Sequence, residues 1–207
     1  MLFQELFWVT LILNLLMLEK IFKSTSEKFA YPFIRLLAYF KIKPNSVSYI
    51  GLIIVIVGSF YFYKNENLLG IVLIFLGSAI DGLDGPYARY INSSSEKGAI
   101  LDSFIDRIGE LIIWSVIGVS YTDTDLELFI IFSILVSSNL IPYIRAMSEN
   151  YNITNKKGIT ARPERIIFAV LFMYFELPFI YMFIFAILTW LTVFQRFIFL
   201  YLSLIHI

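Results

Sequence analysis

Long apolar stretches recur along this chain, and they restrict its fold more than any other feature of the sequence. A helix that crosses a bilayer needs about 20 mostly apolar residues. Of the 207 residues, 59% are hydrophobic and only 15% are charged. We therefore predict an all-α integral membrane protein, a bundle of six transmembrane helices. The expected helices cover residues 46–63, 68–88, 98–120, 126–147, 166–174 and 179–202.

The N-terminal segment has a different pattern. Residues 7–18 are apolar, but they are short for a span and Asn14 interrupts them. Lysines and Arg35 follow, as is typical of a helix that lies on the membrane surface among the lipid headgroups. We predict an interfacial helical segment over residues 1–43 and a six-helix domain over residues 44–207. A seventh span in place of the interfacial helix is the alternative.

Basic residues gather in alternate connections between the apolar stretches. Under the positive-inside rule, such connections face the cytoplasm. The segment before residue 46, the connection at 89–97 and the loop between residues 147 and 166 are rich in Lys and Arg, whereas the opposite loops hold mainly acids. We predict a multi-pass protein of the cell membrane, in contact with membrane lipids, whose 89–97 connection is cytoplasmic. The chain has no Lys/Arg-rich run and no nucleic-acid motif, so we expect no nucleic-acid partner.

Four aspartates lie inside otherwise apolar stretches beside this cytoplasmic connection. Asp81 and Asp84 are three residues apart, and Asp102 and Asp106 are four apart, so each pair is expected on one face of its helix. A short connection makes the two helices antiparallel neighbours. We therefore expect the four carboxylates to converge at one depth near the cytoplasmic surface.

Converging carboxylates in a low-dielectric setting need protons or cations. A hard divalent cation with oxygen ligands fits, so we predict one or two Mg²⁺ or Mn²⁺ ions. The chain has no Cys, which excludes thiolate ligands. Two alternatives stay open: the acids pair with arginines such as Arg89 and Arg107, or they line an ion pathway.

Small residues surround these acids. Gly82 and Gly85 flank Asp84, and Gly98 precedes Asp102 by one turn. Glycine within a helix is costly unless something approaches closely, so these positions leave room for a phosphate or sugar against the backbone. Tight helix packing is the alternative. Pro86 removes a backbone donor and is expected to distort the end of its helix.

The same residues form a pattern that resembles the CDP-alcohol phosphatidyltransferase signature, D-x2-D-G-x2-A-R-x8-G-x3-D-x3-D. All eight fixed positions match with the expected spacing: Asp81, Asp84, Gly85, Ala88, Arg89, Gly98, Asp102 and Asp106. The resemblance covers about residues 29–202. It implies a membrane enzyme, usually a homodimer, that transfers a phosphatidyl-type group from a CDP-linked lipid to an alcohol and releases CMP at the cytoplasmic side.

The resemblance also implies roles for individual residues. Asp81, Asp84 and Asp102 would be the main ligands of two Mg²⁺ or Mn²⁺ ions, and Asp106 would be the general base and touch the second metal. The CDP-lipid would contact Pro44, Asn45, Ser46, Val47, Gly85, Ala88, Arg89, Ser95 and Gly98. An N-cap of the first span is the alternative for Asn45 and Ser46, and it is compatible with ligand contact.

Three further arginines bear on the acceptor. Guanidinium groups suit phosphate, and Arg145, Arg165 and Arg196 come from three different helices. They resemble the basic residues of phosphatidylinositol-phosphate and archaetidylinositol-phosphate synthases, which implies inositol 1-phosphate as acceptor, although Ala161 replaces a Glu of that pattern. Ordinary positive-inside topology is the alternative for Arg145, Arg162 and Arg165. Snorkelling is the alternative for Arg196, if the last helix ends early. Glycerol 3-phosphate, serine or a second lipid stay open as acceptors.

Proteins of other classes fit the sequence less well. An ion-coupled transporter would use buried acids as a relay, but it would more often show internal repeats or paired broken helices. A prenyl-chain enzyme has different aspartate-rich runs, and a catalytically inactive scaffold would not need all four acids. Diacyl and archaeal ether lipids carry the same CDP headgroup, so both fit as donors.

Overall fold

The computed structural model describes residues 30–155 and 158–205, and all regular structure within those ranges is helical. Residues 30–39 are helical and precede the labelled helices. These are α2 (Pro44–Tyr63), α3 (Asn67–Asp81), α4 (Asp84–Tyr90), α5 (Glu96–Tyr121), α6 (Asp125–Asn150), α7 (Arg162–Phe175) and α8 (Ile180–Ile205). The predicted all-α class is confirmed. Most of the predicted interfacial segment, residues 1–29, lies outside the described residues.

Four helical segments of the described chain are long and apolar enough to cross a membrane: Pro44–Tyr63, Asn67–Tyr90, Asp125–Asn150 and Ile180–Ile205. Two helices of the predicted six do not meet this measure. The first 15 residues of α5, 96–110, hold six charged residues. The 14 residues of α7 reach only about 21 Å at 1.5 Å per residue, less than a hydrocarbon core of about 30 Å.

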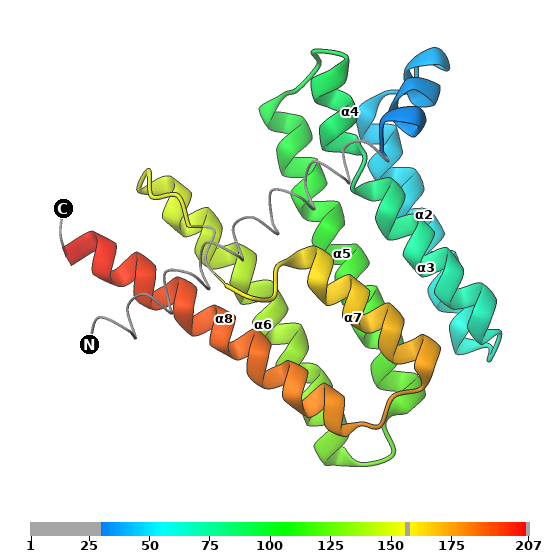
Figure 1. The fold of residues 1–207 in the computed structure, drawn as a ribbon, viewed down its shortest axis with the longest axis vertical. Helices are drawn as coiled ribbons and strands as arrows, with labels where there is room; N and C mark the ends of the chain where they lie inside the picture. Colours follow the sequence, from blue (N-terminus) through cyan, green and yellow to red (C-terminus); the bar gives the residue numbers. More distant parts are fainter. Residues whose placement is uncertain (1–29, 156–157, 206–207) are drawn as a thin grey trace, which may run out of the picture.

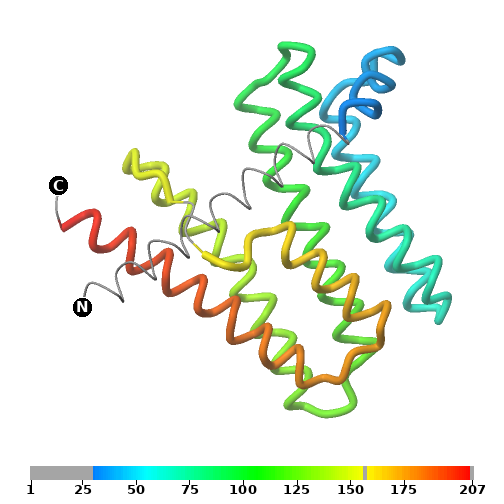
Figure 2. Tube along the Cα trace, viewed as in Figure 1, coloured from blue at the N-terminus to red at the C-terminus, as the bar shows by residue number. Residues whose placement is uncertain are grey.

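The helices form two groups, and α5 and α7 connect them (Figures 1 and 2): α5 contacts α6, and α7 packs on α8 through Phe168 and Phe185. In one group, α2 packs against α3 and α5 along much of its length. In the other, α6 and α8 run side by side. Helix α7 contacts α3 and α5, and the connection before it returns from the end of α6. The start of α7 therefore lies next to the end of α3 and the first turns of α5.

Helices α2 and α3 touch through their backbones. A Cβ atom added to Gly51 would lie 2.8 Å from the backbone nitrogen of Asp81, and one added to Gly77 would lie 2.7 Å from the carbonyl oxygen of Gly51. Gly58 and Gly70 make the same kind of approach further along the pair. Small residues allow this packing in membrane bundles. The contact fixes the last turn of α3 against α2.

The helix predicted at 68–88 is wrong in one respect, because it is broken into α3 and α4 at Gly82 and Leu83. Pro86 explains the break. In a continuous helix its ring would clash with the carbonyl of residue 82, four positions earlier. In the first turn of α4 the same ring is tolerated, because backbone donors there need no partner within the helix.

The interior and the exterior of the bundle are both apolar. Trp114, Ile117, Phe172 and Phe185 belong to one buried cluster that joins α5, α7 and α8. Large apolar side chains also cover the outer faces of the spanning helices: Ile53, Phe60, Phe75, Phe129, Phe132, Phe194 and Phe197 are more than a third exposed. In water such a surface would associate, whereas in a bilayer it faces lipid.

Candidate active site

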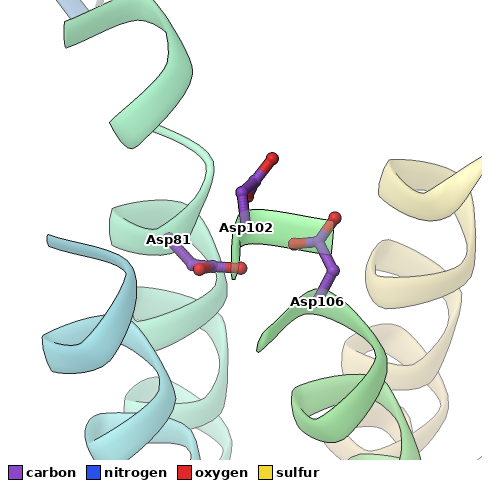
Figure 3. A group of neighbouring side chains, drawn as sticks. All are labelled: Asp81, Asp102 and Asp106. Carbon is purple, nitrogen blue, oxygen red and sulfur yellow. The ribbon is translucent and has the colours of Figure 1, made fainter. Parts of the chain in front are cut away.

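Three of the four predicted aspartates meet where α3 and α5 approach each other (Figure 3). Asp81 is the last residue of α3, and Asp102 and Asp106 lie in the second and third turns of α5. One carboxylate oxygen from each of the three lies within 4.8 Å of the others. Asp81 is almost fully buried and the other two are partly buried. We call these three residues the acid cluster.

Asp84 lies beside the acid cluster but outside that 4.8 Å group. It is the first residue of α4, it is buried, and its carboxylate accepts a hydrogen bond from the hydroxyl of Ser48 on α2. It also interacts with the carboxylate of Asp102. The expectation that Asp81 and Asp84 share one face of one helix is wrong, because α3 ends at Asp81. Ser48 is not predicted from the sequence as a partner.

Two arginines contact the acid cluster. Nη2 of Arg162 lies 2.6 Å from Oδ2 of Asp81, and Nη1 lies 2.5 Å from Oδ1 of Asp106. Nη1 of Arg107 lies 3.8 Å from Oδ2 of Asp106, a looser contact. The sequence suggests Arg89 and Arg107 as partners of the acids and does not indicate Arg162, which is 81 positions from Asp81.

The acid cluster fits a divalent cation by its chemistry. Its donors are carboxylate oxygens, which Mg²⁺ and Mn²⁺ prefer. Oδ1 of Asp81 is buried and has no hydrogen-bond partner among the described residues. Such an oxygen is costly to bury unless a cation or a donor reaches it. Arg162, the closer of the two arginines, carries one positive charge against the three carboxylates of the acid cluster.

The residues predicted beside the nucleotide lie around the starts of α2 and α5. Ser95 is the N-cap of α5, where its hydroxyl accepts a bond of 3.1 Å from the backbone nitrogen of Gly98. A Cβ added to Gly98 would lie 3.5 Å from Oδ1 of Asn45, so the two helix starts are neighbours. A Cβ on Gly85 would lie 3.5 Å from Nη1 of Arg89.

The start of α2 excludes one interpretation of Asn45 and Ser46. Helix α2 begins at Pro44, and its N-cap is Lys43, which makes no side-chain capping bond. Asn45 and Ser46 therefore lie in the first turn of the helix, and the N-cap alternative for them is wrong. Val47 is fully buried and packs with Ile34 in a small apolar cluster. Ala88, in α4, is partly buried.

The three arginines predicted to bind the acceptor phosphate differ in their surroundings. Arg145 is exposed and pairs with Glu149 at 2.9 Å. Arg196 is buried, and its Nη1 donates to the carbonyl of Ile141 at 3.1 Å. It lies within electrostatic range of Arg145 and Arg165. The three are therefore in one region of the molecule.

Arg165 is held by other residues on several sides. Its Nε and Nη2 bind the two carboxylate oxygens of Glu110, and its Nη1 donates to the carbonyl of Thr160 at 2.8 Å. Trp114 donates to Glu110 at 3.4 Å. The sequence alone assigns no role to Glu110, which could extend the face of the acids or make a polar contact inside the bundle. The structure shows the polar contact.

This fold and site define a class of protein. It is an all-helical membrane protein that gathers aspartates from three helices, where α3, α4 and α5 meet. Residues 41–198 match the model of the family described as CDP-alcohol phosphatidyltransferase, and the chain belongs to that family. The resemblance seen in the signature is thereby confirmed, and the protein is a membrane transferase of phospholipid synthesis.

Two relatives cover most of the chain. An uncharacterized protein of Aquifex aeolicus is 31% identical over 182 residues, 87% of this chain and 93% of its own length. The archaetidylinositol phosphate synthase of Pyrococcus horikoshii is 32% identical over 161 residues, 77% of this chain and 84% of its own length.

Crystal structures of the phosphatidylinositol phosphate synthase of Mycobacterium tuberculosis share the fold. The form with CDP-DAG bound has a TM-score of 0.74 and covers 84% of this chain and 94% of its own. The form in complex with manganese and citrate has a TM-score of 0.72 and covers 83% of this chain and 88% of its own. Both are 23% identical to this chain, so the likeness is one of fold.

Proposed function

We propose that this enzyme transfers a phosphatidyl or archaetidyl group from a CDP-linked lipid to the hydroxyl of inositol 1-phosphate and releases CMP. The observation that carries the proposal is the acid cluster, whose three carboxylates lie within 4.8 Å on residues of the family signature. The names of the Pyrococcus and Mycobacterium relatives support the choice of acceptor. The two arginines near Arg196 support an anionic acceptor.

The proposed metal ligands are Asp81, Asp84, Asp102 and Asp106, holding two Mg²⁺ or Mn²⁺ ions. Bound there, the ions would offset the charge that develops on the pyrophosphate oxygens. Oδ1 of Asp81 supports this assignment, because it is buried and has no hydrogen-bond partner within residues 30–155 and 158–205. The manganese complex of the Mycobacterium relative supports it independently, because that enzyme has the same fold.

Asp106 is the proposed general base. In the reaction, the acceptor oxygen forms a bond to the phosphorus next to the lipid, the bond from that phosphorus to the CMP oxygen breaks, and Asp106 accepts the hydroxyl proton. Asp106 is less buried than Asp81, with 17% of its side chain exposed against 4%. Within the cluster it is therefore the more accessible of the two to a hydroxyl that arrives from solvent.

The proposed CDP-lipid site lies between the starts of α2 and α5 and the first turn of α4. Its residues are Pro44, Asn45, Ser46, Val47, Gly85, Ala88, Arg89, Ser95 and Gly98. The short separation between Asn45 and Gly98 supports this location, because it brings two signature regions together beside the acids. The small residue at 98 leaves backbone accessible to a ligand.

The proposed acceptor site uses Arg145, Arg165 and Arg196, with unequal roles. Arg165 has bonds to Glu110 and Thr160, so it contributes positive charge from a fixed position. Arg145, with more than half of its side chain exposed, can reach a phosphate that enters from solvent. Arg196 supplies a third positive charge, from α8.

We also propose how the chain sits in the membrane. Its domain over residues 44–207 would place six helical segments in the bilayer, with α5 and the short α7 completing the bundle and residues 1–43 lying at the interface. A helix shorter than the hydrocarbon core is accommodated by local thinning of the bilayer. The basic connection at 89–97 and the basic start of α7 are both near the acid cluster, which supports an active site facing the cytoplasm. The family resemblance supports a homodimer.

An acceptor panel tests the proposed function. Purified protein, Mg²⁺ and either CDP-diacylglycerol or CDP-archaeol are incubated with inositol 1-phosphate, free inositol, glycerol 3-phosphate or serine, and CMP release is measured. We expect release with inositol 1-phosphate well above the others, and none with Asp102→Asn. Preference for free inositol or serine would contradict the arginine site, and preference for glycerol 3-phosphate would keep the site and change the acceptor.

A further inference from the structure

Arg162 joins three helices through the acid cluster. It is the first residue of α7, and its two terminal nitrogens reach Asp81 at the end of α3 and Asp106 on α5, at 2.6 and 2.5 Å. No other basic side chain of the described residues lies within 4 Å of both acids. The guanidinium therefore lies across the gap between two carboxylates that the proposed metal would also use.

A guanidinium and a divalent cation cannot both hold these oxygens closely. Mg²⁺ binds carboxylate oxygens at about 2.0–2.1 Å. A cation at that distance from both acids would lie within a few ångströms of the guanidinium, where like charges repel strongly in a low-dielectric site. We propose that Arg162 is an internal counter-ion that competes with the metal for Asp81 and Asp106. This inference rests on the metal site of the proposed function.

The contact between Arg162 and the two carboxylates is of a kind that a metal ion can replace. Its Nε is buried and has no hydrogen-bond partner among the described residues, and neither has Oδ1 of Asp81. The contact with Oδ1 of Asp106 has the distance of an ion pair but not the geometry of a hydrogen bond. Unpaired buried groups raise the free energy of this arrangement, so a cation that satisfies the carboxylates better can replace the arginine.

Arg162 is also not needed to hold α7 in place. One turn later, Arg165 ties the same helix to α5 through both oxygens of Glu110. Pro163 fits the first turn of the helix, where its fixed backbone angle is favourable. The start of α7 is therefore anchored by other residues, and Arg162 can leave the carboxylates while the helix stays in position.

The measurement is Mn²⁺ affinity, by electron paramagnetic resonance and by titration calorimetry, on the full chain purified in detergent without substrate. We compare the wild type, Arg162→Gln and Arg107→Gln. Arg107→Gln is the matched control. It also removes a positive charge beside Asp106, but Arg107 forms no ion pair with Asp81. We expect Arg162→Gln to tighten Mn²⁺ binding about tenfold, within the usual range for coupled sites, and Arg107→Gln to change it about threefold or less.

A second readout is thermal unfolding with and without Mn²⁺. In chelator, Arg162→Gln is expected to unfold at a lower temperature than the wild type, because the carboxylates then lack their counter-ion, and saturating Mn²⁺ is expected to remove that difference. Arg162→Lys keeps the charge but loses the two-nitrogen contact with Asp81 and Asp106, so its Mn²⁺ affinity is expected to lie between those of the wild type and Arg162→Gln. Tighter binding by Arg162→Gln together with this rescue would support the inference.

Two results would overturn it in distinguishable ways. If the wild type binds Mn²⁺ and Asp102→Asn abolishes binding, but Arg162→Gln binds no tighter than Arg107→Gln, the metal site is right and the competition is wrong. If neither the wild type nor Arg162→Gln binds Mn²⁺ in the millimolar range, the metal site is wrong and the competition is wrong with it.

Discussion

Arg162 and Arg165 begin the same helix, one turn apart, and both pair with acids of α5, yet their surroundings differ. Arg165 is buried, and its three nitrogens bind Glu110 and Thr160. Arg162 is partly exposed, and its Nε has no partner among the described residues. The better satisfied pair lies deeper in the bundle, and the less satisfied pair lies at the proposed reaction centre.

Because of this difference, two regions of α5 have different roles: Glu110 stabilises the fold, and the acid cluster serves the proposed reaction. Glu110 is one turn beyond Asp106 and receives bonds from Arg165 and Trp114, which suits a permanent structural contact. The acid cluster keeps a buried oxygen without a donor among the described residues. Substitutions in the first region should therefore affect unfolding, and substitutions in the second should affect metal binding and turnover.

The largest expected effect is on turnover. Asp106→Asn removes the proposed base and keeps the shape of the side chain, so CMP release should fall about 10³-fold, within the range for a lost general base. Binding of the CDP-lipid, measured separately, should change only a few-fold. Normal turnover by this variant would contradict the assignment of Asp106 as the general base.

The next effect is on stability. Glu110→Gln leaves Arg165 buried without its countercharge, and breaking such a pair costs about 3–5 kcal/mol. We expect a marked fall in the unfolding temperature in detergent. Replacing both partners by apolar residues, Glu110→Leu with Arg165→Met, should recover most of it. A stability unchanged in Glu110→Gln would contradict the structural role.

A smaller loss is expected at Thr192 on α8. Its hydroxyl accepts from the backbone nitrogens of Ile159 and Thr160 and from the hydroxyl of Thr160, so it fixes the loop whose carbonyl holds Arg165. Thr192→Val leaves the two donors of the buried Thr160 unpaired, at a cost of about 1–3 kcal/mol. Unfolding temperature is again the measure, with Thr122→Val, in another helix connection, as the comparison.

The smallest effect is expected at the surface pair of Arg145 and Glu149. More than half of each side chain is exposed, so Glu149→Gln should change stability by less than about 1 kcal/mol. It is the matched control for Glu110→Gln, since both variants remove a Glu from an arginine. Equal effects of the two substitutions would remove the distinction between buried and surface pairs.

The acids are predictable from the sequence because their spacing is local. Asp102 and Asp106 lie one turn apart, and a short connection joins them to Asp81 at the end of α3, so periodicity and the signature bring them together. Arg162 and Arg165 reach acids 81 and 55 positions away, and nothing in local spacing specifies such partners. The all-α class is likewise predictable from apolar length.

Two features that we did not predict, the break between α3 and α4 and the backbone contact between α2 and α3, do have a signal in the sequence. Pro86 together with two glycines marks the break between α3 and α4, although only a distortion is predicted from it. Gly51 and Gly58 are seven residues apart, as are Gly70 and Gly77, a spacing that places each pair on one helix face. That repeat is by itself an indication that α2 and α3 meet through their backbones.

The backbone contact between α2 and α3 has a mechanical consequence. Because no side chain separates the helices at Gly51 and Gly77, we expect the pair to respond to a thicker or thinner bilayer by tilting as one stiff body, without sliding. Asp81 would then keep its depth relative to the start of α2 as lipid composition varies between growth temperatures.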